Sequence, residues 1–441
     1  MIVELDRETL PSLKNPAFAS YAARYESIYE DFMVQVRKTG IEVDPVGYER
    51  SRAELLGRLQ QKGAIFRNAG RSIYINRISS ACEACRTGLG SATFFISLKC
   101  HRDCFYCFNP NQESYTYHAQ HRRDVAAELE QISRQGLKVN HLALTGGEPL
   151  LHVAQVMDFF QTARAKFPEA YTRLYTTGDH ASPEVLQALK DAGLDEIRFS
   201  IRMHDLEKGH RLTFERIALA KAYIPQVMVE MPVLPGTLEE MKDVLLELER
   251  LEIFSINLLE FCFPFANADV FNRRSYRIKN RPYRVLYNYW YAGGLPVARS
   301  ELECLRLLEF ALDNDLKLGV HYCSLENKHT GQIYQQHANQ VLPGRVYWSE
   351  KDFFLKSAKV FGEDIPQVLG VFRKKGYKGY DWNKDHNYLE FHIDQIRLLR
   401  DLEIEIGIST SVLESRNGDS YLRELKVDLT TPQIFDPAQD L

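Results

Sequence analysis

The chain has 441 residues, 45% of them hydrophobic, and is long enough for two or three domains with buried cores. Its 55 basic and 59 acidic residues give a net charge of −4, which argues against a protein coated overall for nucleic-acid binding. It has no apolar run long enough to span a membrane, and its first residues are charged where a signal peptide is apolar, so we expect a cytoplasmic protein.

Residues 1–80 are expected to form a mainly helical N-terminal extension. Residues 17–62 have the pattern of two amphipathic helices, interrupted near "TGIEVDP", and a β-hairpin with Gly70 at its turn follows. Five of the eight cysteines then fall between positions 82 and 107. Because a reducing cytoplasm keeps thiols free, this clustering favours metal ligation over a disulfide framework.

From Ser91 onward, short β-branched or aromatic runs alternate with helical patterns. The strand-like runs are "ATFFISL", "NHLALTGG", "TRLYTTGD", "DEIRFSIR", "QVMVEMPVLPG" and "FSINLLEF". The helical patterns lie at about 121–135, 152–167, 182–192, 213–222 and 237–250. This alternation predicts parallel strands with right-handed crossovers. Six such units are too few for an eight-unit barrel, so we predict an α/β fold with a partial (βα)6 barrel over residues 81–330.

Two further segments follow the sixth unit. Residues 263–294 form an aromatic and basic insertion within the predicted barrel domain, followed by a helix near 300–314 and the strand "KLGVHYCS". Residues 331–441 alternate strand-like and helix-like runs, so we expect a small α+β C-terminal domain there.

The stretch "CHRDCFYC" places Cys100, Cys104 and Cys107 close together. A structural zinc site would need a fourth ligand, which His101 could supply only by distorting the loop. A ferredoxin-type cluster would need a fourth thiolate nearby, and the stretch stops at three. Three thiolates around a [4Fe–4S] cluster leave one iron with an open coordination position, which suits a reactive cofactor.

This stretch resembles the C-x3-C-x2-C signature of the radical S-adenosylmethionine (radical SAM) superfamily, with an aromatic residue, Tyr106, before the last cysteine. A second element, "LALTGGEPL", ends the second predicted strand and is similar to the superfamily's GGEP motif. That motif binds the amino group of the methionine moiety. Gly146 and Gly147 would let the backbone approach a ligand closely, and Glu148 would supply a carboxylate for an ammonium group.

The resemblance also implies polar cofactor contacts at later strand ends, for ribose and carboxylate groups. This chain offers Thr177, Ser200, Arg202 and Glu230 there. Ser200 and Glu230 lie in apolar runs and need a polar partner if they are buried. The alternative to a cofactor role is a hydrogen bond or ion pair inside the barrel, such as Arg202 with Glu230.

The reaction implied by the resemblance starts with an electron that passes from the reduced [4Fe–4S] cluster to S-adenosylmethionine. A 5′-deoxyadenosyl radical then abstracts hydrogen from a substrate. The resemblance further implies a flavodoxin or ferredoxin-type electron donor. A peptide or small-molecule substrate is favoured, while a nucleic-acid substrate and a non-catalytic iron–sulfur redox protein are the alternatives. Glu148 favours the enzyme, because an electron carrier has no use for an ammonium-binding turn.

The basic insertion carries six cations and no acidic residue within "FNRRSYRIKNRPYR". They are Arg273, Arg274, Arg277, Lys279, Arg281 and Arg284. Because the insertion leaves the end of the sixth strand, we expect it to cover the active site and to recognise an anionic group of the substrate. The alternative is a solvated surface loop.

A second cysteine pair, Cys82 and Cys85 in "ACEAC", precedes the first barrel strand. Two ligands do not close a metal site, so further ligands must come from elsewhere. Strand alternation puts His321 and Cys323 of "GVHYCS" on one face. We therefore expect a second iron–sulfur or zinc site at Cys82, Cys85 and Cys323. A reducible dithiol and two buried cysteines without partners are the alternatives.

Overall fold

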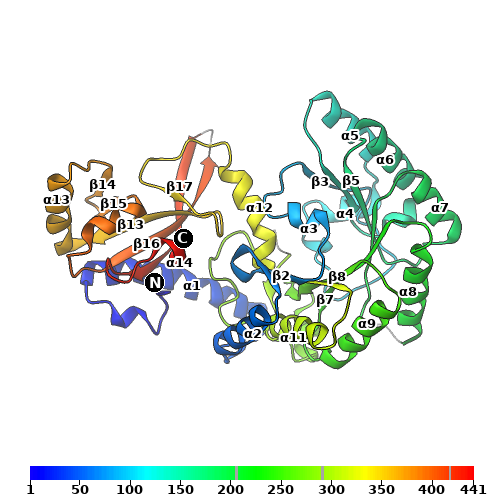
Figure 1. Cartoon of the computed structure of the whole chain (residues 1–441), viewed down its shortest axis with the longest axis horizontal. Coiled ribbons are helices and arrows are strands. Elements are labelled where there is room, and N and C mark those ends of the chain that lie inside the picture. The colour runs from blue at the N-terminus through cyan, green and yellow to red at the C-terminus, as the bar shows by residue number, and fades with distance from the viewer. Residues whose placement is uncertain (204–206, 290–292, 417–418) are drawn as a thin grey trace. The chain divides into compact units, whose positions relative to one another are not determined.

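The structure is a computed structural model that describes residues 1–203, 207–289, 293–416 and 419–441 (Figure 1). The chain folds into two compact units. The barrel unit comprises residues 39–283 and 288–331, and the terminal unit comprises residues 1–38, 284–287 and 332–441. Among the described helices, none combines the length and hydropathy that crossing a bilayer requires.

The barrel unit is built on a sheet in the strand order β1-β2-β11-β8-β7-β6-β5-β4-β3. Its six consecutive parallel strands are β3 (Ser91–Phe95), β4 (His141–Thr145), β5 (Tyr171–Thr176), β6 (Glu196–Phe199), β7 (Gln226–Val233) and β8 (Ser255–Glu260). The predicted α/β partial barrel is therefore confirmed. Beyond β8, β11 (Gly319–Cys323) adds a parallel strand, and the hairpin β1 (Ile65–Arg67) and β2 (Ser72–Ile75) extends the sheet in antiparallel pairing.

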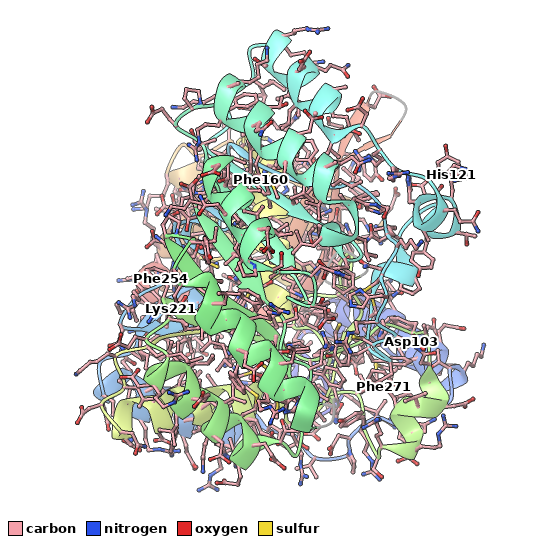
Figure 2. All side chains as sticks on the ribbon, turned by 90° about the vertical axis from the view of Figure 1, so that its right-hand side faces the viewer. Asp103, His121, Phe160, Lys221, Phe254 and Phe271 are labelled. Carbon is pink, nitrogen blue, oxygen red and sulfur yellow. The ribbon has the colours of Figure 1, made fainter. Side chains whose placement is uncertain are left out.

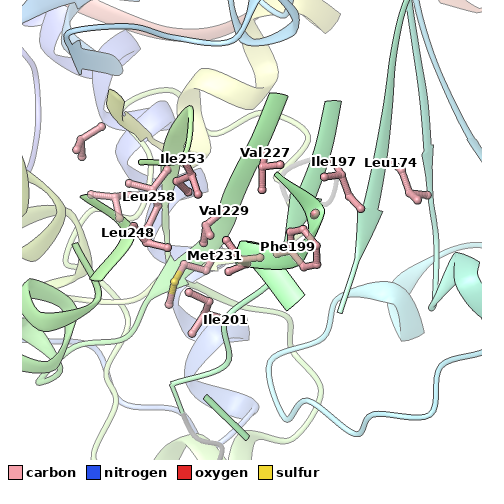
Figure 3. Close-up of a cluster of buried hydrophobic side chains, with 14 of the residues drawn as sticks. Leu174, Ile197, Phe199, Ile201, Val227, Val229, Met231, Leu248, Ile253 and Leu258 are labelled. Atoms are coloured by element: carbon pink, nitrogen blue, oxygen red, sulfur yellow. The ribbon is translucent and has the colours of Figure 1, made fainter. Parts of the chain in front are cut away.

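Helices cover the outer face of this sheet, where alternate strand residues bury their side chains. Leu174, Ile197, Val229 and Leu258 belong to this core (Figure 3). The covering helices are α5 (Val125–Arg134), α6 (Val153–Lys166), α7 (Pro183–Asp191), α8 (Glu207–Ala220), α9 (Leu238–Arg250), α11 (Ser300–Asp313) and α2 (Glu49–Gln61). Because strand side chains alternate, the residues between the core positions lie on the opposite, concave face of the sheet.

Shorter elements complete this part of the chain. They are η2 (Asn68–Gly70), α3 (Ser80–Ala84), η3 (Asn109–Asn111), α4 (Tyr115–Gln120), η4 (Pro149–His152), β9 (Cys262–Phe263), α10 (Ala268–Arg273) and β10 (Leu295–Pro296). The longer helix α12 (Leu325–His337) has residues in both units, since the terminal unit resumes at residue 332. The insertion predicted over residues 263–294 thus contains one short helix, and its residues 290–292 lie outside the described part of the chain.

The terminal unit has an antiparallel sheet in the order β14-β15-β13-β16-β17, with β12 beside β13. Its strands are β12 (Tyr347–Trp348), β13 (Leu355–Phe361), β14 (Tyr380–Asn383), β15 (Tyr388–Phe391), β16 (Ile406–Arg416) and β17 (Asp419–Thr430). Its helices are η1 (Leu10–Ser12), α1 (Pro16–Lys38), η5 (Gly362–Asp364), α13 (Ile365–Lys374), η6 (Ile393–Leu399) and α14 (Pro437–Asp440).

The two units group the N-terminal residues differently from the ranges expected from the sequence. Residues 1–38 lie with the C-terminal sheet, whereas residues 39–80 lie in the barrel unit. The reason is the apolar face of α1, which packs on this sheet. Phe18 stacks on Phe361 with ring centroids 4.6 Å apart, and the Tyr21 hydroxyl donates to the Glu424 carboxylate at 2.7 Å.

Candidate functional site

The three cysteines lie in an irregular loop, residues 96–108, at the carboxyl end of β3. A turn closes around two of them, because the Cys107 N–H donates to the Cys104 carbonyl at 2.9 Å. Burial raises the pKa of the Cys100 and Cys107 thiols, and backbone N–H groups of Arg102 and Asn109 counteract this rise. The Arg102 N–H lies 3.4 Å from the Cys100 sulfur. Such donors favour the thiolate form that a metal needs.

The cysteine loop offers the donor type that an iron–sulfur cluster requires, three thiols within residues 100–107. The charge of Cys100 also raises the pKa of the Cys107 thiol. Within the part of the chain that the structure describes, no three His, Cys, Asp or Glu side chains converge to hold a single metal ion. A cluster does not require that convergence, because each thiolate binds a different iron.

The Gly146–Gly147 turn packs directly on the backbone that leads into this loop. The Gly147 N–H donates to the Ser97 carbonyl at 3.1 Å, and the Glu148 N–H donates to the Lys99 carbonyl at 2.8 Å. A Cβ at Gly147 would lie 2.0 Å from the Lys99 oxygen. The glycines therefore serve close packing against the cysteine loop, and Asn109 Nδ2 donates to the Gly146 carbonyl at 2.7 Å from the loop's other end.

The Glu148 carboxylate is 1% exposed and ties the turn to the end of β5. It accepts hydrogen bonds from Leu150 N at 3.0 Å, from Thr176 Oγ1 at 2.7 Å and from Thr177 N at 2.7 Å. These bonds satisfy a buried charge and fix the geometry of the strand ends. That Glu148 also binds an ammonium group stays a prediction, as do the cofactor roles of Gly146, Gly147 and Thr177.

Asp179 anchors the cysteine loop to the segment after β5, and our sequence reasoning missed it. Its carboxylate accepts two hydrogen bonds from Arg102, each at 2.7 Å, and it lies 2.5 Å from His101 Nε2. Burial acts to raise the pKa of Asp179, but the hydrogen bonds from Arg102 and His101 lower it well below its ordinary value. The signal in the sequence was a carboxylate two residues after Thr177, whose Oγ1 is 3.1 Å away.

Arg202 is buried, and its positive charge lowers the pKa of both the Cys100 thiol and the Asp179 carboxyl. Ser200 makes the hydrogen bond inside the barrel that we considered as its alternative role, from Oγ to the Glu230 carbonyl at 3.4 Å. The Glu230 carboxylate pairs with Arg198 at 2.5 Å, because strand alternation brings both side chains to the concave face. The pairing of Arg202 with Glu230, which we considered as an alternative to a cofactor role, stays a prediction.

The insertion holds Phe105 of the cysteine loop in an aromatic cluster. The Phe105 ring lies 5.4 Å from that of Phe271 in α10, and the Arg274 guanidinium lies over the same ring at 4.5 Å. Figure 2 shows Asp103 of the loop beside α10. The neighbouring Tyr106 ring meets that of Phe261 edge-on at 5.6 Å. The insertion therefore covers the cysteine loop and restricts its movement.

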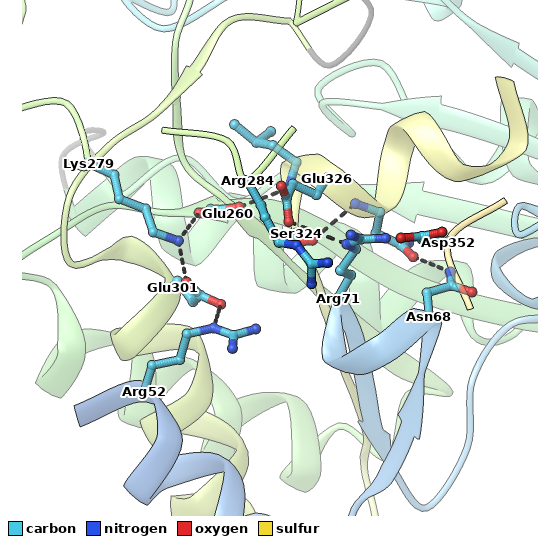
Figure 4. A network of polar contacts seen from close by, with 12 residues as sticks. Arg52, Asn68, Arg71, Glu260, Lys279, Arg284, Glu301, Ser324, Glu326 and Asp352 are labelled. Atoms are coloured by element: carbon cyan, nitrogen blue, oxygen red, sulfur yellow. Dashed lines mark hydrogen bonds and ion pairs between the residues drawn. The ribbon is translucent and has the colours of Figure 1, made fainter. Parts of the chain in front are cut away.

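Several cations of the insertion contact other side chains. Besides Arg274 on Phe105, Arg277 pairs with Glu42 at 3.0 Å. Lys279 lies between two buried carboxylates, at 2.5 Å from Glu301 and 3.8 Å from Glu260 (Figure 4). These cations anchor the insertion to the barrel unit. Recognition of an anionic substrate group by the insertion stays a prediction.

The second cysteine group comes from two separate segments of the barrel unit. Cys82 is half-buried in α3, Cys85 follows α3 and is exposed, and Cys323 is buried at the end of β11. Burial raises the pKa of the Cys323 thiol to about 12, and the charges of Cys85 and Cys82 add to the rise. In the sheet, Cys323 lies opposite Ser72 and Ser72 lies opposite Arg67, whose guanidinium donates to the Cys82 carbonyl at 3.2 Å.

Residues 94–248 match the family model described as the Radical SAM superfamily, and this segment contains the cysteine loop, the glycine turn and Asp179. The chain is 28% identical over 193 residues to a Methanocaldococcus jannaschii protein named as a glycyl-radical enzyme activating enzyme, covering 42% of this chain and 51% of that protein. It is 30% identical over 130 residues to the GTP 3′,8-cyclase of Chlorobaculum tepidum, covering 28% of this chain and 38% of the cyclase. The chain therefore spans about half or less of these relatives.

Solved structures also align with the chain. One is anSMEcpe with bound AdoMet and Cp18Cys peptide, with a TM-score of 0.33, 15% identity, and coverage of 40% of this chain and 51% of that chain. Another is Streptococcus suis SuiB bound to precursor peptide SuiA, with a TM-score of 0.34, 10% identity, and coverage of 48% and 44%.

Proposed function

Because this chain is an enzyme of the radical SAM superfamily, we propose that Cys100, Cys104 and Cys107 hold a [4Fe–4S] cluster and that the enzyme cleaves S-adenosylmethionine. When bound and reduced, the cluster supplies the electron that splits the sulfonium and yields a 5′-deoxyadenosyl radical. The radical then abstracts hydrogen from a peptide or small-molecule substrate. A flavodoxin or ferredoxin-type protein is the proposed electron donor.

One observation carries this proposal: the cysteine loop and the GGEP turn are joined through their backbones. The Gly147 and Glu148 N–H groups donate to Ser97 and Lys99 at 3.1 and 2.8 Å. Ligands of the cluster and of the methionine moiety would therefore sit on one rigid surface at the carboxyl ends of β3 and β4. That end of a parallel α/β barrel is where such folds place their chemistry.

The chain's own residues have separate tasks in this proposal. The N–H donors at Cys100 and Cys107 stabilise thiolates, and Asp179 orients the loop through Arg102. Arg202 lies near Cys100 and supplies a cation for the carboxylate of S-adenosylmethionine. Thr177, Ser200 and Glu230 are proposed for the remaining polar contacts of that molecule.

The test is anaerobic reconstitution with iron and sulfide, followed by dithionite, S-adenosylmethionine and detection of 5′-deoxyadenosine. Cys104→Ala is expected to reduce the product to the level without protein, because too few thiolates remain to hold the cluster. Cys304→Ser is the matched control, since Cys304 is buried in α11 outside the cysteine loop. Product formation at the wild-type rate by Cys104→Ala would overturn the assignment.

A further inference from the structure

The short helix α3, which carries Cys82, lies across the concave face of the sheet. At one side, Arg67 of β1 donates to the carbonyls of Cys82 and Glu83 at 3.2 and 2.9 Å. At the other side, Ser79 Oγ donates to Glu196 of β6 at 2.6 Å. The helix is therefore fixed from two strands that are distant in the sheet, and its cysteine faces a buried polar interior.

Buried N–H donors point at two of the three sulfurs in this region. Arg198 Nη2 lies 3.4 Å from the Cys82 sulfur, and Asn327 Nδ2 lies 3.3 Å from the Cys323 sulfur. The Asn327 amide is itself oriented, because its Oδ1 accepts from Asn68 Nδ2 at 2.5 Å. Hydrogen bonds of this kind stabilise thiolate and sulfide sulfur around metals, and a neutral thiol is only a weak acceptor.

His321 adds a buried nitrogen to the same face. It stands two residues before Cys323 on β11, so the two side chains share the concave face. The side chain is 2% exposed, and its Nδ1 is buried without a hydrogen-bond partner among the described residues. Its Nε2 lies 2.8 Å from Ser72 Oγ. A histidine held at one ring nitrogen with the other nitrogen unpartnered is the usual arrangement of a metal ligand.

We propose that Cys82, Cys85 and Cys323 hold a second iron–sulfur cluster on the concave face of the barrel unit, with His321 offering the fourth ligand. The site is independent of the cluster proposed at Cys100, Cys104 and Cys107. It draws on two segments, β11 and α3 with the residue that follows it, and so fastens the N-terminal part of the unit to the sheet.

The arrangement of the donors favours a cluster over one zinc ion. Zinc takes four ligands at about 2.0–2.3 Å from one point. The segments that carry Cys82 and Cys323 both contact the β1–β2 hairpin, yet no three metal-ligating side chains in the described ranges converge in that way. A [4Fe–4S] cluster places each thiolate on a separate iron and is tuned by hydrogen bonds to its sulfurs, as Arg198 and Asn327 would provide.

The experiment uses the full chain with Cys100, Cys104 and Cys107 all changed to Ala, reconstituted anaerobically with iron and sulfide. About four irons per chain are expected to remain, with a cluster absorption band and an electron paramagnetic resonance signal after reduction. Adding Cys85→Ser, at an exposed position that tolerates serine, is expected to remove this iron. Adding Cys304→Ser instead is the matched control and is expected to leave the iron in place.

A second variant tests the contact at Cys323. Asn327→Leu keeps the side-chain size but removes the donor to the sulfur. In the triple-Ala background it is expected to retain iron and to lower the reduction potential of the remaining cluster. A triple-Ala protein with a wild-type circular dichroism spectrum and no iron would overturn the proposal. So would one zinc per chain in place of iron. Loss of 5′-deoxyadenosine alone would not, because the triple-Ala protein never forms it.

Discussion

Replacing Gly147 with alanine tests how tightly the glycine turn and the cysteine loop are joined. Gly147 does not have a positive φ, so the effect is steric. The new Cβ would lie 2.0 Å from the Lys99 oxygen and 2.4 Å from its carbonyl carbon. To restore an ordinary van der Waals distance between this Cβ and the Lys99 oxygen, the two backbones must move apart by about 1.4 Å. That shift breaks the 2.8 Å bond from Glu148 N to the same oxygen and the 3.1 Å bond from Gly147 N to Ser97.

Two buried hydrogen bonds at about 1 kcal/mol each, with overpacking of about 2 kcal/mol, give an expected destabilisation of about 4 kcal/mol. The measurements are the urea unfolding midpoint and hydrogen exchange of residues 141–150, both without added iron. Gly57→Ala is the control, because a Cβ there meets nothing within 4 Å in α2 and should stabilise the helix slightly. Wild-type stability and exchange in Gly147→Ala would refute the reasoning.

Three further substitutions test the surroundings of the site. Asp179→Asn should lower the free energy of unfolding at pH 7 by about 2 kcal/mol, measured by urea unfolding. Because the pKa of Asp179 is lowered in the folded protein, the difference between wild type and variant should shrink as the pH falls below about 4. Burial raises the pKa of the Glu260 carboxyl to about 7. The stabilisation from its protonated form is therefore fully present below the unfolded pKa of about 4 and is lost as the pH rises through 7. Glu260→Gln should make the free energy of unfolding less dependent on pH between about pH 4 and pH 7. Phe105→Leu should speed hydrogen exchange of residues 100–107 and lower iron uptake, and an unchanged exchange rate would contradict the role of the aromatic cluster.

The regular part of the fold could be predicted because its signals are local. Each barrel strand is an apolar run bounded by turn residues, and each following helix has one apolar face. The placement of α1 could not be predicted in the same way. Its apolar face would suit many surfaces, and its partner, Phe361 of β13, lies far along the chain from Phe18. Amphipathic periodicity identifies a helix but not what covers it.

The same contrast between local signals and long-range contacts applies to the residues of the candidate site. The cysteine spacing and the GGEP turn are short motifs, so the sequence identified both. Asp179 and Arg198 act through partners in other segments of the chain, and the sequence does not place those partners beside them. In "EIRF" the alternation of charged and apolar residues resembles a solvent-facing strand, whereas in a barrel the charged face turns inward. Alternating charged and apolar residues therefore show that a strand has a polar face, but not whether that face contacts water or the protein interior.

Arg198 is a buried cation that contacts one residue proposed for each site, Glu230 and Cys82. Its guanidinium pairs with Glu196 and Glu230, each at 2.5 Å, while Nη2 approaches Ser79 and Cys82 at 3.1 and 3.4 Å. Removing the cation would leave two carboxylates unpaired in the interior, which costs about 3–5 kcal/mol. Such a variant would disturb Glu230 and Cys82 together and could not separate their roles. Asn327 contacts the Cys323 sulfur through a neutral amide, whose oxygen accepts from Asn68. A change there leaves the charges around Arg198 intact, so its effect on the second cluster can be assigned to one sulfur.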